Sequence, residues 1–219
     1  MTTLIEYNSP EYSILLKAFE NTKLDKWIAT TIESFIYEWK EERYKNGNLK
    51  CRYLTRFGEK DGEYKMWREN GQLLLHCNYK EGKREGEYKE WHSTRVEDAR
   101  SPGGDNSQLY IQCYYKEGKI EGEYKQWREN GKLLLHCYYK EGKREGEYKM
   151  WWKNSQLSAH CNYKEGKIEG EYKEWRENGQ LDIHCYYKEG KLEGEYKQWF
   201  DNGQLYIHCY YKEGRKLRI

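Results

Sequence analysis

The chain has 219 residues, and its 39 basic side chains almost balance its 37 acidic ones. This balance argues against a dedicated nucleic-acid-binding protein, which would carry a basic surplus on one face. Twenty-three Tyr and nine Trp supply enough apolar surface for a folded protein. The sequence shows no signal peptide and no apolar run of the roughly 18 residues that cross a bilayer, so we expect a cytoplasmic protein with reduced thiols.

Residues 1–36 differ from everything that follows. Ser9, Pro10 and Glu11 form a helix-start signal, with a capping hydroxyl followed by proline and an acid in the first turn. An apolar stripe at helical spacing then runs from Leu24 to Ile36. We therefore expect two short helices that form an N-terminal cap on the rest of the chain. A separate docking module is the alternative.

The rest of the chain is a tandem repeat. The tetrapeptide Gly-Glu-Tyr-Lys begins at Gly62, Gly86, Gly122, Gly146, Gly170 and Gly194. The spacing is 24 residues, except for one interval that is longer by 12 residues, which places an insertion at about residues 93–105. A fixed period in this range indicates an array whose units bury a core by stacking on their neighbours. We expect about seven units over residues 37–214, followed by a short basic tail at residues 215–219.

The sequence of each unit predicts a β-hairpin. The dipeptide Asn-Gly separates two strand-like runs, as at Asn130-Gly131, and predicts a type I′ turn because both residues tolerate positive φ. At Asn106-Ser107 and Asn154-Ser155 serine replaces glycine, so we expect weaker or altered turns there. A second turn falls in the polar segment Lys-Glu-Gly-Lys, as at residues 140–143.

The longer strand of each unit alternates between apolar and polar residues. Leu133, Leu135, Cys137 and Tyr139 occupy every second position, which is typical of a half-buried antiparallel strand. In the shorter strand the aromatic residues Tyr124 and Trp127 lie three apart, which predicts a bulge or bend between them. The expected fold class is mainly β: an elongated, curved antiparallel β-meander of hairpins of about 24 residues, with the short N-terminal helical cap.

The pattern Gly-Glu-Tyr-Lys-x-Trp-x-x-Asn-Gly-x-Leu, followed by Tyr-Lys-Glu-Gly-Lys-x-x-Gly, resembles the MORN repeat in its variant form, over about residues 38–214. The resemblance is to sets in giant amoebal DNA viruses of the Marseillevirus kind and to bacterial MORN-variant proteins labelled antitoxins. It implies a hairpin array that acts as a scaffold or binding surface without catalysis. In a viral setting the compartment would be the host cytoplasm or the virion. Classical arrays are associated with membranes and phosphoinositides, which implies lipid as an alternative partner.

Two columns of residues recur in the units, and we expect both to form the structural core of the array. His-Cys pairs such as His136-Cys137 invite a zinc hypothesis, but neighbouring residues of a strand point to opposite faces and cannot chelate one ion. We therefore predict no metal site. The expected core columns are Trp67, Trp91, Trp127, Trp151, Trp175 and Trp199, and Cys77, Cys113, Cys137, Cys161, Cys185 and Cys209.

A candidate interaction surface consists of outward tyrosines, one in most units, together with arginines of the insertion. Exposed aromatic residues in a line suit protein contact, and long loops on a regular scaffold often carry recognition. The alternatives are that the insertion is merely tolerated and has no role in recognition, and that the tyrosines are buried in the core. The candidate residues are Tyr114, Tyr138, Tyr186, Tyr210, Arg95 and Arg100.

No catalytic set is recognisable, since every chemically active residue type recurs from unit to unit. We therefore predict a protein that is not an enzyme and needs no cofactor. The expected function is a non-catalytic repeat scaffold for protein–protein interaction, with an antitoxin-like inhibitory binder or a lipid-associated adaptor as the alternatives. A protein partner is expected, and so is self-association through the open edge of the last strand, around Leu205 to Tyr211.

Overall fold

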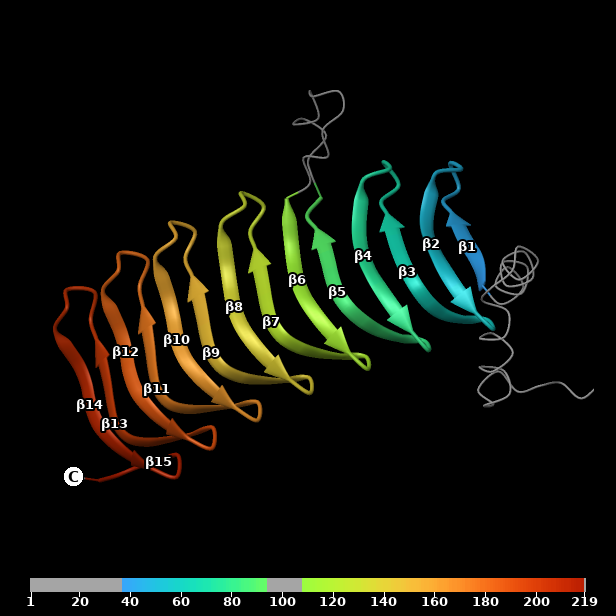
Figure 1. Ribbon diagram of the computed structural model, residues 1–219. Coiled ribbons are helices and arrows are strands. Elements are labelled where there is room, and N and C mark those ends of the chain that lie inside the picture. Colours follow the sequence, from blue (N-terminus) through green and yellow to red (C-terminus); the bar gives the residue numbers. More distant parts are fainter. Residues whose placement is uncertain (1–36, 94–107, 219) are drawn as a thin grey trace, which may run out of the picture.

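The computed structural model describes residues 37–93 and 108–218. These residues form one antiparallel sheet of 15 strands, in which each strand pairs with the strands that precede and follow it in the sequence. Figure 1 shows the resulting elongated ribbon, which does not close on itself. The predicted mainly β meander is confirmed. The predicted helical cap over residues 1–36 lies outside the described residues, and so does most of the insertion, including Arg95 and Arg100.

Strands of nine and eight residues alternate along the ribbon from Glu59 to Lys212. Two strands form the first unit, β1 (Tyr37–Arg43) and β2 (Leu49–Arg56). The following strands are β3 (Glu59–Trp67), β4 (Leu73–Lys80), β5 (Lys83–Trp91), β6 (Leu109–Lys116), β7 (Lys119–Trp127), β8 (Leu133–Lys140), β9 (Lys143–Trp151), β10 (Leu157–Lys164), β11 (Lys167–Trp175), β12 (Leu181–Lys188), β13 (Lys191–Trp199), β14 (Leu205–Lys212) and β15 (Arg215–Lys216). The strand that the sequence indicated as the longer one, such as β8, is therefore shorter than β7 by one residue. The two residues of β15, which the sequence assigned to the tail, pair with the end of β14.

The core lies on one face of this single sheet. Tyr124 of β7 stands opposite Cys137 of β8, and the same Tyr–Cys pair recurs along the ribbon. All seven cysteines are buried, with exposed fractions of 1–4%, and Tyr64 and Tyr88 are buried with them. Because the described residues provide no second layer over this sheet, their burial of the cysteines requires the sheet to curl around its own side chains. The strands in Figure 1 all curve in the same sense.

Irregular pairing produces the bend of the strands. The register between β7 and β8 shifts between Gln126 and Trp127, which confirms the bulge predicted between Tyr124 and Trp127. A second irregularity follows Cys137, where β8 meets β9 at Gly146. Gly146 has φ +77°, and an added Cβ there would meet no atom within 4 Å. The backbone conformation, and not lack of space, therefore favours glycine at the bend.

The Asn-Gly loops are not the predicted type I′ turns, and that turn type occurs at the other turn of each unit. In the Asn-Gly loop, the Gly131 N–H donates to the Arg128 carbonyl and the Arg128 N–H donates to the Lys132 carbonyl, each over 2.9 Å. Only Gly131 has positive φ, so this is a three-residue loop with glycine in the left-handed position, and the type I′ prediction was wrong. Ser155 takes that position at φ +70° and keeps the same hydrogen bonds.

The true two-residue turns lie at Glu-Gly. Glu141 and Gly142 both have positive φ, at 51° and 79°, and the flanking Lys140 and Lys143 pair across the strands. These are the features of a type I′ turn. The ribbon therefore has two distinct edges, which we call the Glu edge, formed by the Glu-Gly turns, and the Asn edge, formed by the Asn-Gly loops.

Candidate interaction surface

The Glu edge joins each unit to the next with the same two hydrogen bonds. The Glu141 N–H donates to a carboxylate oxygen of Glu121, in the preceding unit, over 2.7 Å. The neighbouring Gly142 N–H donates to the Ile120 carbonyl over 2.9 Å. Equivalent carboxylates of Glu85, Glu145, Glu169 and Glu193 accept the corresponding turn N–H groups of Glu117, Glu165, Glu189 and Glu213. Turn N–H groups that would otherwise lack a protein partner are thereby satisfied.

The Asn edge also joins neighbouring units, but with different side chains. In six successive units, the residue that follows the first strand donates to the carbonyl of the next unit's Trp. Arg128 Nη2 donates to Trp151 over 2.7 Å. His92 Nε2 lies 2.7 Å from the Trp127 carbonyl, and since a carbonyl only accepts, this ring nitrogen carries the hydrogen. Tyr44, Arg68, Trp152 and Arg176 make the same bond in their units. A backbone acceptor thus allows the donor side chain to vary.

The varying residue packs against a second varying residue of its own unit, the second residue of the eight-residue strand. The rings of His92 and Tyr110 have centroids 4.5 Å apart, and those of Phe200 and Tyr206 are 4.4 Å apart. In another unit the pair is ionic, Arg176 with Asp182 at 2.6 Å. We call these two positions the variable pair. Differences between units are thus concentrated at the Asn edge.

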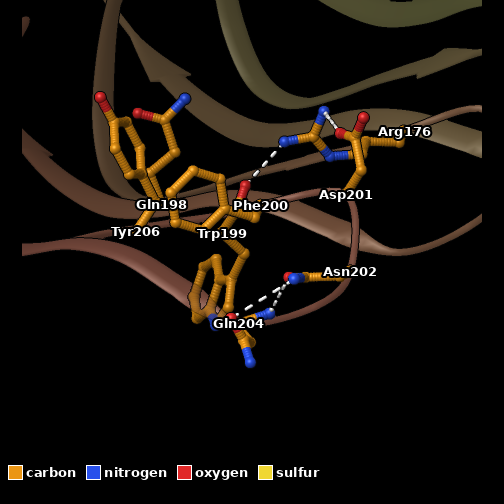
Figure 2. A pocket seen from close by; sticks show the side chains of 8 residues that line it. All are labelled: Arg176, Gln198, Trp199, Phe200, Asp201, Asn202, Gln204 and Tyr206. Atoms are coloured by element: carbon orange, nitrogen blue, oxygen red, sulfur yellow. Dashed lines mark hydrogen bonds and ion pairs between the residues drawn. The ribbon is translucent and has the colours of Figure 1, made fainter.

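Open grooves lie at the Asn edge, each beside a tryptophan. The groove at Trp199 has a volume of about 660 Å³, and Figure 2 shows Arg176, Asp201 and Tyr206 around it. The groove at Trp127, of about 470 Å³, occupies the equivalent position in an earlier unit. Its lining is His92, Tyr110, Gln126, Trp127, Arg128, Glu129, Asn130, Leu134 and Lys153. Each of these two grooves thus combines a Trp wall with a variable pair.

The structure places the two predicted core columns differently. The cysteines lie inside the packed cluster, with tyrosines and aliphatic side chains against them. The tryptophans are half-buried, and neither Trp67 nor Trp91 packs against that cluster. Trp67, Trp127 and Trp199 instead line grooves at the Asn-Gly loops. The bulge that precedes each Trp takes it out of the alternation that buries the Tyr–Cys pairs.

The face opposite the cysteines carries a row of paired charges, and we call it the His face. Glu123 accepts from Lys125 over 2.8 Å and contacts His136 Nε2 at 2.9 Å. The hydrogen bond from Lys125, together with the one from His136, holds the pKa of the Glu123 carboxyl below its ordinary value. Equivalent sets are centred on Glu63, Glu147, Glu171 and Glu195. These charges neutralise one another, so the row is polar without a strong net sign.

The predicted tyrosine row lies on the His face, toward the Glu edge. Tyr114, Tyr138, Tyr186 and Tyr210 are 38–45% exposed. Three of them pack against the histidine two residues before, with centroids 5.1 Å apart for His136 and Tyr138. The histidine contact fixes each ring on one side and leaves its other side open to solvent.

The cysteines offer no reactive or metal-binding site. Burial raises the pKa of the Cys137 thiol from 9.0 to about 11, so its nucleophilic thiolate is scarce at neutral pH. All seven cysteines are free thiols. Within residues 37–93 and 108–218, no cluster of three or more His, Cys, Asp or Glu side chains is arranged to hold a metal ion. The same residues contain no helix that is long and apolar enough to span a membrane.

Known proteins offer a match for the repeat but not for the chain as a whole. None of the curated proteins matches the chain. Among solved structures, the crystal structure of TarM is similar at 10% identity and a TM-score of 0.22, over 80% of this chain and 25% of that one. The chain thus spans about a quarter of that protein, and a likeness this weak carries no argument. The model of the MORN repeat variant matches residues 60–81, 120–141, 144–165, 168–189 and 192–213, which together make up half of the chain. The chain belongs to the MORN repeat variant family.

Proposed function

We propose that this protein is a non-catalytic repeat scaffold that binds a protein partner through its His face and Asn edge. The observation that supports it most is the contrast between the two faces of the sheet. One face is closed around the cysteines, whereas the other presents partly exposed tyrosines in four units, Tyr114, Tyr138, Tyr186 and Tyr210. Rigid aromatic side chains on a preformed surface are well suited to protein contact, because little side-chain entropy is lost when they are covered.

Site-specific photocrosslinking tests this proposal. A benzophenone amino acid at Tyr138 or Tyr186 should give one discrete crosslinked protein in the native source. The same probe at Lys167, on the Glu edge, is the matched control and should give none. Replacing the neighbouring tyrosines of the row with alanine should abolish the crosslink. Equal crosslinking at Lys167, or an adduct that survives the alanine variants, would contradict a specific surface.

We propose self-association through β14 as a second activity. β15 covers only the end of this strand, where Tyr211 pairs with Lys216 and Lys212 pairs with Arg215. Within the described residues, Leu205 to Cys209 have no strand on that side, and Leu205 and Tyr206 are about half exposed. Such an edge accepts a further strand by main-chain hydrogen bonding. Light scattering after size-exclusion chromatography should show a dimer, and Ile207→Pro should restore the monomer.

The antitoxin-like and lipid-binding alternatives predict other results. An inhibitory binder would form a tight one-to-one complex with a partner whose activity it blocks. A lipid-associated adaptor would float with liposomes that contain acidic lipids, and salt would release it. The balanced charge of the His face supports the protein-binding proposal over the lipid one.

A further inference from the structure

Three arginines occupy equivalent positions at the Asn edge, Arg68, Arg128 and Arg176, and the surroundings of Arg128 differ from those of Arg176. Arg128 and Arg176 each follow a Trp, and each donates Nη2 to the carbonyl of the next unit's Trp. In both side chains Nε is buried and has no hydrogen-bond partner. Burying part of a guanidinium costs free energy unless an anion or acceptor compensates it.

Carboxylates of the chain itself compensate the charge of the Arg176 guanidinium. A carboxylate oxygen of Asp182, the second residue of β12, lies 2.6 Å from Nη2. Asp201, in the next unit's loop, contacts Nη1 at 2.5 Å. Two carboxylates therefore flank this guanidinium, and Figure 2 shows Arg176 against Asp201.

Among the described residues, no carboxylate compensates the charge of the Arg128 guanidinium in this way. The residue that corresponds to Asp182 is Leu134, and the residue that corresponds to Asp201 is Lys153. No carboxylate of the described residues lies within ion-pair distance of the Arg128 guanidinium. Both Arg128 and Lys153 line the groove at Trp127, where Glu129 is the acidic side chain. The groove thus holds two cations against one anion, with His92 beside them.

The rest of this groove is apolar. Tyr110, Trp127 and Leu134 line it, and it remains open to solvent. A ligand that fits has a carboxylate for the two cations and an apolar side chain for the Trp wall. A protein segment with an acidic residue next to an aromatic or aliphatic one has both.

We propose that the groove at Trp127 binds an acidic, apolar segment of a protein partner, whose carboxylate takes the place that Asp182 and Asp201 hold at Arg176. This inference rests on the proposed protein-binding function and names the chemistry of the partner. Arg128 and Lys153 bind the carboxylate, and Tyr110, Trp127 and Leu134 contact the apolar side chain.

The test uses a fluorescein-labelled peptide, Gly-Ser-Asp-Phe-Asp-Ser-Gly, and the full chain. Its fluorescence anisotropy should rise on binding, and added salt should weaken binding because the contact is ionic. A peptide with Asn in place of each Asp is the matched control and should bind at least about tenfold more weakly. Equal affinity for the two peptides, or binding of neither, would overturn the proposal.

Protein variants locate the contact. Lys153→Asp should supply the missing carboxylate within the chain and reduce peptide affinity by about tenfold or more, without loss of the fold. Lys167→Asp makes the same change of charge at the Glu edge and should leave the affinity unchanged. The converse exchange, Asp182→Leu with Asp201→Lys, frees Arg176 and should raise the binding stoichiometry by one. Equal loss in the two lysine variants would show a general effect of charge and would overturn the assignment to this groove.

Two further results separate the possible failures. If the peptide does not bind but the crosslink at Tyr138 persists, the groove inference fails and the scaffold proposal stands. If the crosslink is lost but the peptide still binds, the tyrosine row fails as a contact surface and the groove inference stands.

Discussion

The two edges of the ribbon connect neighbouring units by different means. At the Glu edge, a glutamate carboxylate accepts the turn N–H of the next unit in five successive units, as Glu121 does for Glu141. At the Asn edge the acceptor is the main-chain carbonyl of Trp, and the donors are Tyr44, Arg68, His92, Arg128, Trp152 and Arg176. A side-chain acceptor restricts its position to an acidic residue, with Asp61 in place of Glu at the Glu81 turn, whereas a backbone acceptor leaves the donor free to differ.

Under the proposed function, this difference separates maintenance of the fold from recognition. The Glu edge repeats the same hydrogen bonds from unit to unit, although the side chain near its turns varies, as at Arg84, Ile120 and Leu192. The Asn edge keeps its inter-unit hydrogen bonds while its grooves differ in charge, as the surroundings of Arg128 and Arg176 show. A scaffold of nearly identical repeats can thereby present distinct sites along one side.

The largest effect on stability should come from high pH, because it acts on the buried cysteines of the core that both edges share. Burial raises the pKa of the Cys77, Cys137, Cys161 and Cys185 thiols from 9.0 to about 11, and that of Cys113 to about 12. The unfolded chain therefore loses these protons first, so stability is full below about pH 9 and falls as the pH rises toward 11. Thermal unfolding followed by circular dichroism should show the largest drop in Tm over that interval. Thiol labelling should appear only together with unfolding, and labelling of the native protein at pH 8 would contradict burial.

The next largest effect should come from the Glu edge. Glu145→Ala removes the 2.7 Å hydrogen bond to the Glu165 N–H and should cost about 1 kcal/mol of unfolding free energy, because the carboxylate is solvent-accessible. Glu145→Gln keeps an acceptor oxygen and should cost less. Urea denaturation of the two variants measures the difference. Equal stability of the alanine variant and the parent protein would show that this bond does not hold the units together.

Ser155 allows the Asn edge to be improved. It holds φ +70° where the other described Asn loops have glycine. Ser155→Gly should therefore stabilise the protein by about 0.5–1 kcal/mol, since it relieves the left-handed conformation. Ser93→Gly, at a position outside the left-handed region, is the control and should bring no gain. A loss of stability in the Ser155 variant would show that the hydroxyl makes a contribution of its own.

The smallest effect should come from exchanging one donor for another at the Asn edge. Arg68→His copies His92 and should change the unfolding free energy by less than about 0.5 kcal/mol, because either side chain can donate to the Trp carbonyl. Arg68→Leu removes the donor and should cost about 1 kcal/mol. If the histidine and leucine variants are equally destabilised, the donors are not interchangeable and the contrast between the edges fails.

Much of the fold follows from local rules that the sequence displays. The 24-residue period gives the order of the strands, and the alternation from Leu133 to Tyr139 gives the buried face. The three-residue interval between Tyr124 and Trp127 gives the bulge. Each of these features depends on residues within one hairpin, where spacing alone constrains the geometry.

The turn types could not be assigned from dipeptides alone. Asn-Gly favours type I′ in isolation, but five residues separate Trp127 from Leu133 and only a longer loop accommodates them. Glutamate is an uncommon residue at positive φ, and its turn N–H is bonded to a carboxylate 20 residues earlier. The groove at Trp127 likewise combines His92, Trp127 and Lys153 from three units. Aligning the units with one another would have revealed that the two positions of the variable pair differ between units. It would not have shown that these two side chains pack against each other.

Donors and acceptors of neighbouring units lie one unit apart, 20 residues for Glu141 and Glu121 and 23 for Arg128 and Trp151, and this has a consequence for how such a gene can change. The bonds between units at the two edges each reach one unit along, so a duplicated or lost segment of one full period meets compatible neighbours on both sides. Insertion of a partial period would shift the register and break both sets of bonds. Recombination by whole periods can therefore lengthen, shorten or reorder the series of grooves while the units keep the same fold. Under the proposed function, such changes would alter which partners the protein binds.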